Sequence, residues 1–189
     1  MPATDISRRA LILRLAGLPL AASFAPALAK ADTVTRGAAE DDGLAHSAAM
    51  IHQEVVFKAS RERVFRALVT TAQFDAITRL SDAVDLLTAP GAKPTSISTA
   101  LGGSFTLFGG YVTGRHLDMV PDERLVQAWR AGSWHPGDYS IVRFALMESG
   151  AGTRLVFEHR GFPDSQGSSL AYGWRVHYWE PLAKFLAQG

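Results

Sequence analysis

The chain has 189 residues, of which 47% are hydrophobic and 20% charged, and its formal net charge is +1. This composition is that of an ordinary globular protein with about one domain. The balanced charge excludes the strongly basic profile of a nucleic-acid-binding protein, so no nucleic-acid partner is expected. The chain has no cysteine, which excludes disulfides, thiol catalysis and lipid attachment to a cysteine.

The first 29 residues predict a secretory signal peptide. Ser7-Arg8-Arg9 precedes an apolar run over residues 10–22, and the small residues of Ala27-Leu28-Ala29 follow. A basic start, a short apolar core and small residues at the cleavage site are typical of such signals. The run contains Arg14 and is shorter than the ~20 residues that span a bilayer. We therefore expect no stable membrane span after cleavage.

The paired arginines favour the twin-arginine export route, and the general secretory route is the alternative. Either route predicts a periplasmic or secreted bacterial protein. Cleavage after residue 29 removes three arginines and one aspartate and changes the formal net charge from +1 to −1. Residues 30–49 are rich in Ala, Gly, Asp and Glu without apolar periodicity, which predicts a flexible linker. The folded domain is expected over residues 50–189.

The first part of the domain predicts one strand and two helices. Residues 51–58 are β-branched and partly alternating, which indicates a strand. Ser60 is a good N-cap for a helix over residues 61–70, and a second short helix is expected over residues 71–77. Residues 82–88 are interpreted as a strand and residues 89–94 as a loop.

A meander of strands and a final helix are expected after this loop. Short turns rich in glycine or proline, among them Gly109-Gly110, separate the predicted strands, as is typical of antiparallel neighbours. The strands are expected at residues 104–108, 111–120, 124–130, 139–148 and 153–160. The chain then predicts one long helix over residues 168–187, so the fold class is α+β.

The final helix carries a broad aromatic face. At 3.6 residues per turn, one stripe combines Trp174, Tyr178, Leu182 and Phe185. Such a face either fills a core or lines a small-molecule cavity. The polar tips of its tryptophan and tyrosine side chains need partners when they are buried, which adds weight to a cavity. Pro181 cannot donate a helical hydrogen bond to the carbonyl of the residue four positions earlier, so a bend is expected there.

Several short motifs resemble, in their order and spacing, those of the SRPBCC (START-like, helix-grip) superfamily. Within it, the chain is similar to the C-terminal domain of the activator of Hsp90 ATPase. The resemblance extends over about residues 51–187. Its motifs are Phe57-Lys58-Ala59-Ser60-Arg61-Glu62-Arg63-Val64-Phe65-Arg66-Ala67-Leu68, Gly102-Gly103-Ser104-Phe105, residues 121–130, Gly152-Thr153-Arg154-Leu155, Gly161-Phe162-Pro163, and Gly173-Trp174 with residues 178–182. The chain departs from the pattern at Phe74, because similar members commonly carry a tryptophan in that short helix.

The resemblance implies a helix-grip fold, in which a curved antiparallel sheet wraps around a long C-terminal helix and two short helices follow the first strand. It also implies a cavity between sheet and helix, where family members bind or transform hydrophobic molecules. We therefore expect a hydrophobic or amphipathic small molecule as the partner. The aromatic walls of its site are predicted at Phe105, Phe108, Tyr111, Trp129, Trp134, Trp174 and Tyr178.

Catalytic and metal-ligating patterns are weak in this sequence. The six histidines form no HxH or HExxH spacing, so neither a metal nor another cofactor is predicted. Strand alternation places Glu158 and His159 on opposite faces of their strand, and no catalytic pair is identified. His116 and His159 lie on predicted strands, where they are expected to face the cavity or the solvent, and a partly buried structural histidine is the more common outcome. The loop around Trp134 is expected to close over the cavity mouth or to pack against Phe162 or the linker.

Two alternatives to a binding protein remain open from the sequence. The first is a cyclase-like or dehydratase-like enzyme that uses the same cavity, with His116 or His159 pointing inward beside a carboxylate. The second is a protein-interaction module similar to the Hsp90 activator, against which the export signal argues because that role needs a cytosolic ATP-driven chaperone. The oligomeric state is left open.

Overall fold

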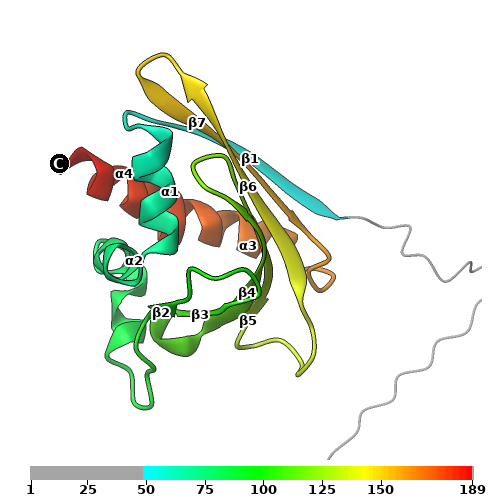
Figure 1. Ribbon diagram of the computed structural model, residues 1–189. Helices are drawn as coiled ribbons and strands as arrows, with labels where there is room; N and C mark the ends of the chain where they lie inside the picture. Colours follow the sequence, from blue (N-terminus) through cyan, green and yellow to red (C-terminus); the bar gives the residue numbers. More distant parts are fainter. Residues whose placement is uncertain (1–48, 189) are drawn as a thin grey trace, which may run out of the picture. The chain divides into compact units, whose positions relative to one another are not determined.

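The computed structural model of the chain describes residues 49–188 (Figure 1). The predicted signal peptide, and the predicted linker apart from Ala49, lie outside the described residues. Within the described part, no helix is long and apolar enough to cross a membrane.

A seven-stranded antiparallel sheet forms the framework, with the strand order β1-β7-β6-β5-β4-β3-β2. The strands from β3 to β7 follow one another in sequence and in space, which confirms the predicted meander. The first strand of the chain, β1, pairs with the last, β7, in antiparallel fashion, with Met50 opposite Arg160 and Phe57 opposite Thr153. The strands are β1 Met50–Phe57, β2 Ser96–Ile97, β3 Ser104–Leu107, β4 Val112–Val120, β5 Arg124–Ala131, β6 Ser140–Ser149 and β7 Gly152–Arg160.

The two short helices after the first strand are confirmed as α1 Arg61–Val69 and α2 Thr71–Thr78. The hydroxyl of Ser60 accepts a hydrogen bond from the backbone N–H of Arg63 at 3.3 Å, as an N-cap does. Both helices lie on the same face of the sheet as the C-terminal helix (Figure 1).

The strand predicted at residues 82–88 is wrong. This segment is a 3₁₀ helix, η1 Asp82–Leu87. The hydroxyl of Ser81 accepts from the backbone N–H of Ala83 at 3.1 Å. The two aspartates of its first turn suit the positive end of the helix dipole. The capping signal therefore overrides the β propensity of the apolar residues that follow. The two-residue edge strand β2 was not predicted.

The C-terminal helix consists of three consecutive parts, α3 Gly167–Gly173, a π-helical segment η3 Trp174–Trp179, and α4 Glu180–Ala187. The backbone N–H of Glu180 bonds to the carbonyl of Arg175, five residues back. The next residue, Pro181, has no N–H with which to continue α-helical bonding. The irregularity at this proline is therefore a widened turn that ends just before it.

The core lies between this helix and the inner face of the sheet. Phe157 and Leu155 on β7 and Val142 on β6 have no exposed surface, and Leu182 on α4 is 1% exposed. Burial alternates along β5 from one residue to the next, as expected for a sheet covered on one face.

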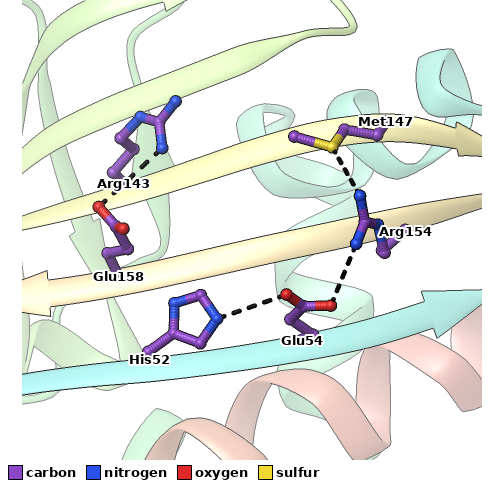
Figure 2. Close-up of polar contacts among 6 residues, drawn as sticks. All are labelled: His52, Glu54, Arg143, Met147, Arg154 and Glu158. Atoms are coloured by element: carbon purple, nitrogen blue, oxygen red, sulfur yellow. Dashed lines mark hydrogen bonds and ion pairs between the residues drawn. The ribbon is translucent and has the colours of Figure 1, made fainter.

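The outer face of the sheet carries charged side chains that pair across strands. Figure 2 shows Arg154 on β7 between Glu54 on β1, at 3.4 Å, and the sulfur of Met147 on β6, at 3.2 Å. Arg143 on β6 faces Glu158 on β7 at 4.0 Å. Exposed pairs of this kind contribute only about 0–1 kcal/mol each. They mark this face as solvated, so the candidate site lies on the other face.

Gly114, on the inner face of the sheet, lies where the backbone and the core are too closely packed for a side chain. A Cβ at Gly114 on β4 would overlap the carbonyl oxygen of Ala128 and the ring of Phe105. Gly114→Ala is expected to lower the free energy of unfolding by about 1–3 kcal/mol because the backbone must shift. Urea denaturation measures this change. In the matched variant Gly173→Ala the new Cβ meets nothing nearer than 3.8 Å, so equal losses in both variants would contradict the prediction.

Candidate ligand-binding cavity

A cavity of about 400 Å³ lies between the start of the C-terminal helix, the inner face of the sheet and η1. Its walls combine aromatic and aliphatic side chains with a few polar groups. The lining residues are Asp82, Ala83, Asp85, Leu86, Phe108, Tyr111, Val112, Trp129, Ala131, Gln166, Ser169, Leu170, Gly173, Trp174, His177 and Tyr178. Cavities of this size and character are typical small-molecule sites.

The sheet supplies one wall of the cavity through alternate residues of two adjacent strands. Trp129 and Ala131 lie two positions apart on β5 and therefore share its inner face. Val112 is paired with Ala131 from the neighbouring strand β4. The small side chain of Ala131 beside the large indole of Trp129 leaves the space that the cavity occupies.

The turn between β3 and β4 shapes the next part of the wall. Phe108 has a positive φ of 51°, a conformation that costs a non-glycine residue about 1–2 kcal/mol. Its ring is 3% exposed and packs edge-on against Tyr178, with the centroids 5.2 Å apart. At Gly109, a Cβ would overlap the carbonyl oxygen of Leu86. This close backbone approach holds η1 beside the cavity.

The π-helical segment η3 supplies the opposite wall. Trp174, His177 and Tyr178 all belong to it, and all three line the cavity. The rings of Trp174 and Tyr178 lie 4.1 Å apart, and the ring of Trp174 lies 5.6 Å from that of Trp129 on the sheet. Helix and sheet are thus joined by direct aromatic packing at the inner end of the cavity.

The polar tips of the wall aromatics have partners within the protein. The indole N–H of Trp129 donates to the hydroxyl of Tyr178 at 3.4 Å. Burial raises the pKa of Tyr178 above its usual range, so this phenol stays neutral. Each of the chain's four tryptophans donates its indole N–H to a protein acceptor. The walls are therefore fixed in orientation by hydrogen bonds as well as by packing.

His159 is fixed behind the cavity wall by a chain of hydrogen bonds. The indole of Trp174 donates to Nδ1 of His159 at 3.0 Å, so the ring proton lies on Nε2. Nε2 donates to the hydroxyl of Ser140 at 2.7 Å, and that hydroxyl donates to the carbonyl of Trp129 at 3.0 Å. Burial lowers the pKa of His159 from 6.5 to about 3. The imidazole is neutral and serves as a connector between two cavity walls.

His116 is also buried without exposed surface and does not line the cavity. The amide of Gln127 lies 3.4 Å from its Nδ1, and burial lowers the pKa of His116. Among the described residues, neither His116 nor His159 forms an ion pair with a carboxylate. The arrangement that the enzyme alternative predicts at these two histidines does not occur there. The chain from 49 to 188 also brings no three potential metal-ligating side chains together.

The polar part of the lining consists of carboxyl, amide, hydroxyl and imidazole groups. Asp82 and Asp85 come from η1, Gln166 and Ser169 from the start of α3, and His177 from η3. Nδ1 of His177 is buried and has no hydrogen-bond partner among the described residues. No lysine or arginine belongs to the lining.

The structure brings five of the seven predicted wall residues together around the cavity. They are Phe108, Tyr111, Trp129, Trp174 and Tyr178. Phe105 lies on β3 outside the lining, and its ring packs 5.5 Å from His116. Trp134 lies behind the wall rather than over the mouth. It is 5% exposed, its ring is 5.3 Å from that of Trp129, and it donates to the side chain of Gln166 at 2.8 Å.

Sequence reasoning missed most of the polar lining. Asp82 and Asp85 were placed on a strand, although the order Ser81-Asp82-x-x-Asp85 is the start signal of a helix. His177 lies on the helix that carries the predicted aromatic face but is not among the predicted wall residues. Gln166 and Ser169 carry no local signal, because their place at the cavity depends on how the loop after β7 returns to the sheet.

A curved antiparallel sheet closed by a long C-terminal helix over an aromatic cavity defines a helix-grip domain of the SRPBCC type. The model of the family "Activator of Hsp90 ATPase homolog 1-like protein" matches residues 58–187. The chain belongs to this family.

Curated relatives include the activator of 90 kDa heat shock protein ATPase homolog 1 of Homo sapiens and of Mus musculus. Each is 26% identical over 133 residues, which are 70% of this chain and 36% of the relative. The chain thus spans about a third of the length of these relatives.

Solved structures share the fold at low sequence identity. An HSP90 activator from Plasmodium falciparum has a TM-score of 0.59 and 20% identity, covering 74% of this chain and 96% of that one. CalU16 from Micromonospora echinospora has a TM-score of 0.55 and 21% identity, covering 74% and 76%.

Proposed function

We propose that this chain is an exported helix-grip protein whose cavity binds a hydrophobic or amphipathic small molecule. The observation that carries the proposal is the aromatic-walled cavity of about 400 Å³ between the C-terminal helix and the sheet. Full burial of one apolar group of side-chain size contributes about 1.5–3 kcal/mol. A few such contacts are enough for roughly micromolar affinity. The export part of the proposal is supported by the sequence of residues 1–29.

Native mass spectrometry of the protein purified from its own host tests both parts. A bound molecule adds its mass to the folded protein and is released by denaturing extraction, and cleavage of the signal removes about the first 29 residues. A protein that carries no small molecule and takes up none from a lipid or metabolite extract of the host contradicts the binding function. An uncleaved chain found inside the cell contradicts export.

Filling the cavity is expected to abolish this binding. Ala131 is 3% exposed and lines the cavity, so the phenyl ring of Ala131→Phe occupies space that the ligand needs. We expect the amount of co-purified molecule to fall at least about tenfold, the equivalent of losing one good apolar contact. Circular dichroism checks the fold, since overpacking costs about 1–3 kcal/mol.

Ala183→Phe is the matched control, because Ala183 is exposed on α4 and does not line this cavity. This variant is expected to retain the molecule. Retention at the same level in folded Ala131→Phe would mean that the ligand binds elsewhere.

A role as a protein-interaction module is the second candidate, and the family match over residues 58–187 favours it. Stimulation of the ATPase activity of an Hsp90 chaperone by the full chain tests this role directly. A rate that rises with added chain and saturates supports it, whereas an unchanged rate at excess chain contradicts it. The export signal argues against such a partner, because that chaperone is cytosolic.

A further inference from the structure

We infer that the cavity binds an apolar ligand that carries an uncharged hydrogen-bond acceptor, such as a carbonyl oxygen, and that the hydroxyl of Tyr178 donates to it. This inference rests on the proposed binding function and specifies the ligand class. It follows from the direction of the hydrogen bonds within the cavity wall.

The hydroxyl of Tyr178 keeps a proton that no group in the described part of the chain accepts. Tyr178 and Trp129 both line the cavity, and the indole nitrogen lies 3.4 Å from the phenol oxygen. An indole N–H can only donate, so the phenol oxygen is the acceptor in this bond. The O–H of Tyr178 is therefore left over as a donor in the cavity wall.

Burial makes this unused donor significant. Tyr178 is 6% exposed, so bulk water has little access to its hydroxyl. Burial also raises the pKa of Tyr178, and the phenol therefore keeps its proton at neutral pH. A buried donor without an acceptor is unfavourable, so a ligand oxygen that reaches this O–H restores a hydrogen bond that folding removed.

Gln166 presents a donor of the same origin. The indole N–H of Trp134 donates to Oε1 of Gln166 at 2.8 Å, which fixes the oxygen of this amide towards the indole. The NH₂ group of Gln166 has no acceptor among residues 49–188, and Gln166 lines the cavity. Two tryptophans thus occupy the acceptor sides of two lining side chains and leave their donor sides free.

Other hydroxyl and imidazole groups of the lining are less available to a ligand. Ser169 donates its hydroxyl to the carbonyl of Gln166 at 2.9 Å, and the hydroxyl of Tyr111 pairs with that of Ser133 at 3.3 Å. Nδ1 of His177 is itself buried. Donors rather than acceptors are therefore what this hydrogen-bond pattern leaves for a ligand.

The charges of the lining favour an uncharged acceptor. No lysine or arginine belongs to the lining, and burial of a carboxylate without a cation is far more costly than burial of a carbonyl group. Asp82 and Asp85 are exposed and add only negative charge. A ketone, ester or amide oxygen on an apolar body is the chemistry that fits these walls.

Two probes of almost the same shape test the inference by equilibrium dialysis against the full chain, freed of co-purified molecules. They are 2-acetonaphthone and 2-isopropenylnaphthalene, which has a CH₂ group in place of the carbonyl oxygen. Tyr178→Phe is expected to weaken the ketone about fivefold and the hydrocarbon less than about twofold. The difference in hydrophobicity between the probes cancels, because each is compared with itself in the two proteins.

Tyr172→Phe is the matched control. It removes the same hydroxyl from a residue of the same helix that is 59% exposed and lies outside the lining. This variant is expected to leave the affinity of both probes unchanged. Circular dichroism checks the fold of Tyr178→Phe, since the substitution also removes the acceptor of the Trp129 indole.

Infrared spectroscopy of the bound ketone tests the hydrogen bond itself. A carbonyl that accepts a hydrogen bond stretches at a lower frequency, so we expect a lower frequency in the unaltered chain than in hexane, and a return towards the hexane value in Tyr178→Phe. If Tyr178→Phe does not fold, the unaltered chain alone decides, because a frequency equal to that in hexane overturns the inference.

The outcomes separate this inference from the binding function. If both probes bind and Ala131→Phe blocks them, but Tyr178→Phe weakens them equally, the binding function stands and the donor role of Tyr178 is overturned. If neither probe binds the unaltered chain, both are overturned.

Discussion

Trp174→Ala is expected to lower the free energy of unfolding by about 3–5 kcal/mol, the range for deleting a large buried aromatic side chain. Trp174 is 2% exposed, and its ring lies 4.3 Å from that of Phe157 and 4.1 Å from that of Tyr178. It also holds His159 through the indole N–H. The loss therefore combines a cavity in the core with an unpaired nitrogen. Urea denaturation followed by circular dichroism measures it.

Two further variants identify the cause of this loss. Trp174→Phe keeps much of the ring but removes the donor to His159, and is expected to cost about 1–3 kcal/mol of that total. Tyr172→Ala changes an aromatic residue on the same helix that is 59% exposed, and is expected to change stability by no more than about 0.5 kcal/mol. Similar losses for Trp174→Ala and Tyr172→Ala would show that Trp174 does not join helix to sheet.

Stability is expected to fall as the pH is lowered through the range where free histidine titrates. Burial lowers the pKa of His159 from 6.5 to about 3 in the folded protein. Below pH 6.5 the unfolded chain therefore binds a proton that the folded chain does not, so acid favours unfolding. Above the range where free histidine titrates, His159 makes its full contribution to the free energy of unfolding. This contribution is lost at up to about 1.4 kcal/mol per pH unit as the pH falls from 6.5 towards the pKa of His159 in the folded protein.

Denaturation midpoints between pH 7.5 and 4.5 measure this slope, above the range where most carboxylates titrate. Burial also lowers the pKa of His116, so the variant His159→Gln isolates one histidine. This variant is expected to be less stable than the unaltered chain at pH 7.5 but to lose less stability towards pH 4.5. Equal slopes for the two proteins would mean that His159 is protonated in the folded state.

The sequence predicts the framework of this fold well because its elements carry local signals. The alternating residues of β4 to β7 and the aromatic face of the C-terminal helix have clear periodicities, and the observed bounds differ from the expected ones by only one or two residues. The error at η1 has a local cause as well. Its apolar residues suggest a strand, whereas Ser81 caps a helical turn through its hydroxyl.

The cavity was less predictable because it depends on contacts between distant segments. Aromatic residues on the expected inner faces were good candidates, and Trp129 and Trp174 do line it. Phe105 and Trp134 are also aromatic and buried. Phe105 packs against His116, however, and Trp134 packs behind Trp129. No periodicity distinguishes a residue that lines a space from one that fills it. The polar lining from η1 and α3 likewise depends on how separate segments meet.

The π-helical segment before Pro181 limits which changes in length the C-terminal helix can accommodate. A π turn holds one residue more than an α-helical turn, so α4 is offset by one residue, or about 100°, from a regular continuation of α3. Trp174 and Leu182 are nevertheless both buried. Loss of a single residue from η3 would turn either the aromatic half or the α4 half of the helix towards solvent. A single-residue deletion in η3 is therefore expected to disturb the fold more than a substitution there.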